Sequence, residues 1–256
     1  MQYAESSLDR CVLANTRSQW GEDLALLPYL RRAAGWRPGV FVELGAFDGV
    51  SFSNTYSLET CYNWTGLLIE ANPANFASLS RSGRRATKVH SAVCERRSNV
   101  NMTLGGKNMA AQVEALSKMQ RRRIWGERAY RTVEVSCSPL SALMAANAGL
   151  HAAHFLSLDV EGAEEAVLKT IDPACFAVVM VELDGTDRRR DERVHELLSS
   201  AGLHYQRHLA LKNSAVYLRP KRVVGPAGRA RRKRHGVPQT NCGCRCGALA
   251  ATPHVV

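Results

Sequence analysis

The residues from Val40 to Gly49 constrain the fold more than any other segment of the chain. An apolar run reaches Glu43 and Leu44, which is typical of a parallel strand that is buried on both faces. Gly45 and Gly49 follow, and glycines let a backbone turn sharply and approach a ligand closely. Since open α/β sheets bind ligands at the carboxyl ends of their strands, the segment predicts a strand that ends at a ligand site.

A second apolar segment, from Trp64 to Glu70, also ends in an acid. Glu70 follows Gly45 by about 25 residues, close to the separation at which nucleotide-binding folds place a carboxylate beside the ribose hydroxyls. A carboxylate can accept hydrogen bonds from both hydroxyls of a cis-diol. We interpret Glu70 as a ribose ligand. The alternative is that Glu70 only stabilises the N-terminus of a helix that begins at Pro73.

Apolar and amphipathic segments alternate along the chain in the order that a doubly wound α/β sheet requires. Helices are predicted over residues 23–34, 53–61, 73–79, 109–123, 138–148, 163–170 and 186–200. Buried strands are predicted over 40–44, 67–70, 87–93, 154–158 and 177–183, half-exposed strands over 100–104 and 131–135, and a closing strand pair over 204–209 and 214–218. This order predicts a mostly parallel sheet with an antiparallel edge strand.

Four separated motifs resemble those of the FkbM family of S-adenosylmethionine-dependent methyltransferases. They are Ser18-Gln19 with Gly21-Glu22-Asp23, Val42 to Gly49, Leu68 to Pro73, and Phe155 to Glu164, and Val181-Glu182 is similar to the strand end that follows in this family. The resemblance covers residues 18–219 in matching order. Phe47 stands where methyltransferases in general have the middle glycine of a Gly-x-Gly-x-Gly motif.

The resemblance implies a Rossmann-like methyltransferase domain over residues 37–220, after a helical segment over 1–36, with S-adenosylmethionine as the cofactor. The residues expected to bind this cofactor surround the first three strand ends: Gln19, Glu43, Gly45, Ala46, Asp48, Gly49, Glu70, Ser91 and Ala92. Gln19 is expected at the methionine end, Glu70 at the ribose and Ser91 beside the adenine ring.

Catalysis is expected at Asp159 and Glu161, which follow the strand over 154–158. A base assists transfer to a hydroxyl group, and two neighbouring carboxylates raise the pKa of one of them toward that of a useful base. The alternative is that Asp159 caps the following helix and that Glu161 or Glu164 complements its dipole. His154 is a third candidate. A divalent metal held by Asp159, Glu161 and Glu182 is a less favoured alternative.

The positive charge of the chain is concentrated near its C-terminus. The sequence has 34 Lys and Arg residues against 23 Asp and Glu, and residues 221–256 contain no acid but include the basic cluster from Arg231 to Arg234. This segment is rich in Gly, Pro and Arg, which predicts a disordered basic tail. Such a tail binds nucleic acid or another anionic surface, directs nuclear import, or has no fixed role. Its three cysteines, Cys242, Cys244 and Cys246, lack the spacing that is typical of zinc sites.

The eight cysteines show no regular framework, so we expect free thiols in a reducing compartment and a cytoplasmic location. No run of 18 or more apolar residues is present, and no transmembrane segment is therefore expected. Residues 1–17 lack the apolar centre of a signal peptide, although nuclear import or a removed targeting segment remains compatible with the sequence.

Three function classes compete at this stage. The first is S-adenosylmethionine-dependent O-methylation of a sugar or another hydroxylated small molecule. The second is methylation of a nucleic acid or protein that the basic tail recruits. The third is a nicotinamide-dependent oxidoreductase, which ranks last because the sequence lacks a Gly-x-Gly-x-x-Gly motif.

Overall fold

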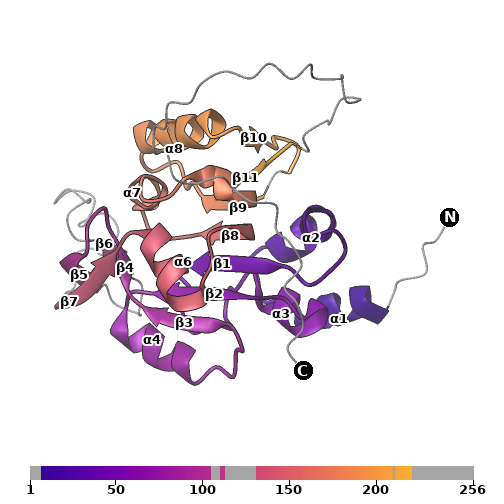
Figure 1. The fold of residues 1–256 in the computed structure, drawn as a ribbon, viewed down its shortest axis with the longest axis horizontal. Coiled ribbons are helices and arrows are strands. Elements are labelled where there is room, and N and C mark those ends of the chain that lie inside the picture. Colours follow the sequence, from indigo (N-terminus) through magenta and orange to yellow (C-terminus); the bar gives the residue numbers. More distant parts are fainter. Residues whose placement is uncertain (1–6, 105–109, 113–130, 210, 221–256) are drawn as a thin grey trace, which may run out of the picture.

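The computed structural model describes residues 7–104, 110–112, 131–209 and 211–220 (Figure 1). A seven-stranded sheet forms its centre, in the order β10-β11-β9-β8-β1-β2-β3. Its strands are β1 (Val40–Leu44), β2 (Thr65–Glu70), β3 (Thr87–His90), β8 (Ala153–Leu158), β9 (Phe176–Glu182), β10 (His204–Tyr205) and β11 (Ser214–Leu218). The pairings from β3 to β9 are parallel, whereas β11 is antiparallel to both of its neighbours. The predicted α/β sheet with an antiparallel portion is confirmed.

Helices cover both faces of this sheet. On one face lie α2 (Glu22–Ala33), α3 (Tyr56–Tyr62) and α4 (Pro73–Ser80), and α1 (Ser7–Asn15) packs on α3. On the other face lie α6 (Leu140–Ala148), α7 (Glu164–Leu168) and α8 (Arg188–Ser200). A short 3-10 helix, Pro173–Cys175, leads into β9. The first two strands therefore run between two helical layers, as their uninterrupted apolar residues predict.

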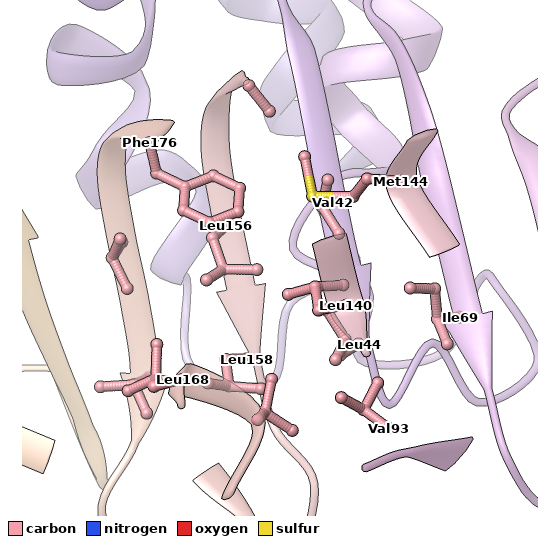
Figure 2. Close-up of a cluster of buried hydrophobic side chains, with 14 of the residues drawn as sticks. Val42, Leu44, Ile69, Val93, Leu140, Met144, Leu156, Leu158, Leu168 and Phe176 are labelled. Carbon is pink, nitrogen blue, oxygen red and sulfur yellow. The ribbon is translucent and has the colours of Figure 1, made fainter. Parts of the chain in front are cut away.

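Alternate residues of each strand supply two separate cores. Phe41 and Phe155 point toward α2 and α3, whereas Val42 and Leu156 point toward α6 and α7. Figure 2 shows the second core, where Leu140 and Met144 of α6 lie against the side chains of β1 and β2. Each fully buried apolar side chain of this size stabilises the fold by about 1.5–3 kcal/mol.

A second, four-stranded sheet extends from the end of β3, in the order β4-β7-β5-β6 (Figure 1). It consists of β4 (Ala92–Val93), β5 (Ser98–Leu104), β6 (Ala110–Gln112) and β7 (Arg131–Ser138). The predicted single strand over 87–93 is wrong, because the chain leaves the first sheet at Ser91. There the backbone N–H donates to Glu70 O at 3.2 Å and the hydroxyl donates to Ser136 O at 3.2 Å. Within the predicted helix over 109–123, residues 110–112 are a strand and the others lie outside the described residues.

Four of the eight cysteines form disulfides, so the prediction of free thiols is wrong for them. Cys11–Cys61 joins α1 to α3, and Cys94–Cys137 joins the end of β4 to β7. The partners are 50 and 43 residues apart in sequence, which is why no local spacing pattern indicated them. Cys175 is buried and forms no disulfide with the other described cysteines, and the tail cysteines lie outside the described residues. None of the helices in the described part of the chain combines the length and hydrophobicity that a bilayer crossing requires.

Candidate active site

Acidic residues gather at the carboxyl edge of the central sheet. Glu43, Glu70 and Glu182 stand at or next to the ends of β1, β2 and β9, and Asp159 directly follows β8. Successive strand residues alternate between faces, and these acids follow the parity of Phe41, Leu68, Phe155 and Met180, which face α2, α3 and α4. The fold therefore brings acids from four separate segments to one edge and one face of the sheet.

Glu43 is buried and binds the loop that follows β1. One carboxylate oxygen accepts from Asn54 N at 2.8 Å, and the other accepts from the hydroxyls of Ser53 at 2.9 Å and Thr55 at 2.5 Å. These hydrogen bonds use both oxygens of Glu43. Its observed contribution is thus to shape the loop over residues 50–55.

Glu70 is also buried and joins two other loops. Its carboxylate accepts from Phe47 N at 2.8 Å and from Asn72 N at 2.7 Å, and Asn72 is the N-cap of α4. Burial raises the pKa of Glu70 to about 7, although the backbone hydrogen bonds favour the ionised form. The arrangement matches the helix-start alternative, and ribose binding by Glu70 stays a prediction.

The glycine turn after β1 packs against the chain itself. Gly45 has φ +74, and a Cβ at this position would overlap the backbone oxygen of Asp159. The N–H groups of Gly45 and Ala46 both lie 3.1 Å from Ile69 O, and Asp48 accepts hydrogen bonds from the Val50 and Ser51 N–H groups at 2.8 and 2.6 Å. Glycine at 45 thus lets the ends of β1 and β8 approach each other.

The strongest electrostatic coupling lies between Asp159 and Glu182. Their carboxyl groups share a hydrogen bond, and Asp159 also accepts from the backbone N–H of Glu161. Loss of surrounding water and the neighbouring charge raise the pKa of Glu182 to about 9, and loss of water also raises the pKa of Asp159. In this hydrogen bond Glu182 is the donor and Asp159 is the acceptor.

Glu161 and Glu164 complete this acidic cluster. Loss of water, followed by repulsion from Asp159 and Glu164, raises the pKa of Glu161 to about 7. Glu164 accepts from Gly162 N at 2.9 Å and lies 3.6 Å from the Arg190 guanidinium. The predicted alternative, in which Asp159 caps the helix, is wrong, because α7 begins at Glu164 and its N-cap is Ala163, with no side-chain cap hydrogen bond.

A narrow pocket of about 30 Å³ opens beside the Asp159–Glu182 pair. Its walls come from segments that are distant in sequence, and the lining residues include Gln19, Trp20, Phe52, Asn54, Asp159, Glu182 and Lys212. Asn54 donates from Nδ2 to Ser157 Oγ at 3.1 Å, whereas its Oδ1 is buried without a hydrogen-bond partner among the described residues. Asn54 is thus left with an unused acceptor beside the acids.

The comparison with protein families favours the two methyltransferase classes over the oxidoreductase. The methyltransferase FkbM domain family matches residues 43–205, which is more than half of the chain. The chain belongs to the FkbM methyltransferase family. A search of curated proteins returned no significant match.

Solved structures of several methyltransferases are similar to this FkbM chain at low identity. Methyltransferase FkbM from Methylobacillus flagellatus KT is 13% identical with a TM-score of 0.42, over 82% of this chain and 57% of that one. An O-methyltransferase from Bacillus cereus in complex with SAH is 12% identical with a TM-score of 0.40, over 86% and 93%. A putative RNA methyltransferase from Pyrococcus horikoshii is 8% identical with a TM-score of 0.41, over 83% and 96%. The chain thus spans 57% of the length of the FkbM structure.

The edge of the FkbM domain suits the charged end of S-adenosylmethionine. The unused acceptor on Asn54 complements an ammonium group, and the Asp159–Glu182 pair complements a positively charged sulfur. Gln19 lines the same pocket, and its contact with the methionine end stays a prediction. The residues present therefore fit the cofactor that the family uses.

Ser91 lies at a second and larger cavity in this FkbM fold. The cavity, of about 560 Å³, lies between the end of β3, the second sheet and α6, and Ser91 and Ser138 line it. Ala92 is buried in β4, and its carbonyl accepts from the Ser91 hydroxyl at 2.7 Å. Adenine binding beside these two residues stays a prediction.

The structure does not bring His154 to the acids of the FkbM site. His154 is the second residue of β8, at the amino edge, five residues before Asp159, which corresponds to roughly 16 Å along a strand. Its Nδ1 accepts from Val40 N at 3.0 Å, and burial lowers its pKa. We correct the catalytic prediction for His154, since a neutral ring at the opposite edge stabilises the start of β1.

Several pocket residues were not predicted from the sequence. Trp20, Phe52, Asn54 and Lys212 carry no motif of their own, and only the fold brings them together. Within the described residues, no group of three or more His, Cys, Asp or Glu side chains is arranged to hold a metal ion. We derive no step through the divalent metal that the sequence left as an alternative.

Proposed function

We propose that the chain transfers a methyl group from S-adenosylmethionine to a hydroxyl oxygen of a sugar or another small molecule. The observation that carries this proposal is the Asp159–Glu182 carboxyl pair beside a pocket at the carboxyl edge of the sheet. When bound, S-adenosylmethionine supplies a methyl carbon attached to a positively charged sulfur. The protein supplies the base that accepts the hydroxyl proton, and it orients the acceptor toward the methyl carbon.

Asp159 is the residue best placed to accept the acceptor's hydroxyl proton. It lines the pocket and has a raised pKa, whereas Glu161 is not among the lining residues. A carboxylate with a raised pKa is a stronger base, which suits general base catalysis. Glu182 keeps its proton and donates to Asp159, so it orients the base and stabilises its charge.

Substitution of Asp159 tests the proposal. Asp159→Asn is expected to lower kcat by about 10²-fold or more, the usual contribution of a general base, while the affinity for S-adenosylhomocysteine stays within about threefold. Methyl transfer from labelled S-adenosylmethionine to a panel of hydroxylated small molecules gives the rate, and calorimetry gives the affinity. Glu196→Gln, an exposed acid on α8, is the matched control.

Two results would redirect the proposal. Unchanged turnover in Asp159→Asn would remove Asp159 as the base, and Glu161→Gln is then the next variant to measure. If deletion of residues 221–256 abolishes activity and binding weakens steeply with salt, the acceptor is a nucleic acid or protein recruited by the tail.

The two disulfides favour an oxidising compartment over the cytoplasm that the sequence predicted. Disulfides persist in secretory and other oxidising environments and are reduced in the cytosol. Alkylation of free thiols in protein from its native source, followed by mass spectrometry, tests this point. If Cys11 or Cys94 is alkylated without prior reduction, the disulfides are not formed in the native protein, and a reducing compartment is the better assignment.

A further inference from the structure

Two exposed aromatic side chains stand at the mouth of the acidic pocket. Trp20 and Phe52 are 50% and 59% exposed, and both line this pocket together with Asp159 and Glu182. Large aromatic residues usually bury most of their surface, because each buries 150–250 Å² when covered. Their exposure next to polar groups therefore indicates a surface that a ligand covers.

Local contacts hold both rings in place. Trp20 N donates to Glu22 at 2.7 Å, and the ammonium of Lys212 lies 3.7 Å from the centroid of the Trp20 ring. The backbones of Ser18 and Phe52 pair as a parallel bridge, which fixes the loop before α2 against the loop after β1. The two aromatic residues thus belong to one preformed rim.

The backbone at Phe52 is strained. Its φ of 61 lies in the left-handed region, which bulky side chains rarely adopt, and Phe47 beside it has a φ of 51. The two phenyl rings stack with their centroids 6.4 Å apart. Strain of this kind costs on the order of 1–3 kcal/mol and is concentrated at functional sites. Here the residue with the strained backbone lines the pocket.

The pocket of about 30 Å³ is too small to hold a ring beside the charged end of the cofactor. The acceptor must then lie across the rim, with an apolar face on the aromatic residues and hydrogen-bonding groups toward Asp159 and Lys212. A saccharide ring has both features, since its C–H groups form an apolar face and its hydroxyls project from the edge.

We infer that Trp20 and Phe52 bind the ring of a saccharide acceptor and present one of its hydroxyls to Asp159. This inference rests on the proposed O-methyltransferase function and names its substrate class. Lys212 keeps the Trp20 ring in place and adds a donor for a sugar hydroxyl at the rim.

Single substitutions at the rim test the inference. The probes are the methyl glycosides of glucose, mannose, galactose, fucose and xylose, assayed with labelled S-adenosylmethionine, with catechol as the aromatic competitor. Trp20→Ala and Phe52→Ala are each expected to raise KM for the best glycoside at least tenfold, and Trp20→Phe to recover part of the loss. Trp36→Ala is the matched control, because Trp36 is 67% exposed but follows α2 at the amino edge of the sheet.

Affinity for S-adenosylhomocysteine, measured in the same variants, separates the possible failures. An unchanged affinity with a raised glycoside KM supports the inference. If Trp20→Ala loses the affinity for S-adenosylhomocysteine instead, the ring belongs to the cofactor site and the inference is overturned. If wild-type protein binds S-adenosylhomocysteine but accepts catechol and no glycoside, the saccharide assignment is wrong and methyl transfer stands. If it does not bind S-adenosylhomocysteine at all, the proposed function fails first.

Discussion

Arg84 is the residue whose loss we expect to destabilise the site loop most. It is 6% exposed, and its guanidinium donates to Glu59 at 3.0 Å, Gly49 O at 2.6 Å and Thr55 Oγ1 at 2.9 Å. Thr55 also binds Glu43, so Arg84 supports the loop that carries Phe52 and Asn54. Replacement by methionine keeps an unbranched apolar stem and removes the guanidinium and its charge.

The expected cost follows from the charge that is left behind. Removing one partner of a buried ion pair costs about 3–5 kcal/mol, because the other charge stays buried without compensation. Glu59 keeps its hydrogen bond from Arg85 N at 2.6 Å, so we expect the lower end, about 3 kcal/mol. A change of this size shifts the unfolding equilibrium by roughly a hundredfold.

Urea unfolding followed by far-UV circular dichroism measures this cost. The matched control is Arg188→Met on α8, whose side chain is 90% exposed and pairs with Glu192 at 3.0 Å. An exposed pair of this type contributes less than about 1 kcal/mol. If Arg84→Met unfolds within 1 kcal/mol of the wild type by this measure, the buried pair does not hold the loop in the way described here.

Three further predictions concern the pH response, the cross-links and the glycine turn. Because Glu161 and Glu182 have pKa values raised from 4.5 to about 7 and about 9, the folded state binds protons more tightly than the unfolded state. The melting temperature should therefore fall as the pH rises from about 5 toward 9, and Glu182→Gln should flatten this decline. A melting temperature that rises over this range would contradict the predicted direction of the pH dependence. The double replacement Cys94→Ser and Cys137→Ser should lower the free energy of unfolding by up to about 4 kcal/mol, because the unfolded chain is no longer restricted by a closed loop of 43 residues. An unchanged urea midpoint would argue against the cross-link. Gly45→Ala should destabilise by about 2 kcal/mol or more, whereas Gly202→Ala, with a similar φ and open space around it, should cost only about 1 kcal/mol; equal costs in urea unfolding would mean that the β1 and β8 ends do not meet.

The strands of the central sheet could be predicted because their signals are local. The apolar run at Val40–Leu44 coincides with β1, and the predicted helix over 23–34 differs from α2 by one residue at each end. The break at Ser91 could not be predicted, since it depends on hydrogen bonds to Glu70 and Ser136, which are distant in sequence. Local propensity carries no information about such bonds.

The acids of the site were predicted, but their contacts were not. Sequence spacing placed Glu43 and Glu70 at neighbouring strand ends, where the structure has them, yet it gave no indication that the nearby loops use their oxygens. The pocket is harder still to predict. Its walls come from residues near 20, 54, 159 and 212, and no periodicity links these segments.

The proton shared by Asp159 and Glu182 has a consequence for any thermodynamic measurement on this protein. A ligand with a positive charge beside the pair lowers both pKa values, so the protein releases part of a proton when the ligand binds. That proton is taken up by the buffer, and its heat of ionisation is added to the heat of binding. Titrations in Tris and in phosphate at the same pH should then give different apparent enthalpies, and the difference counts the protons that leave the carboxyl pair.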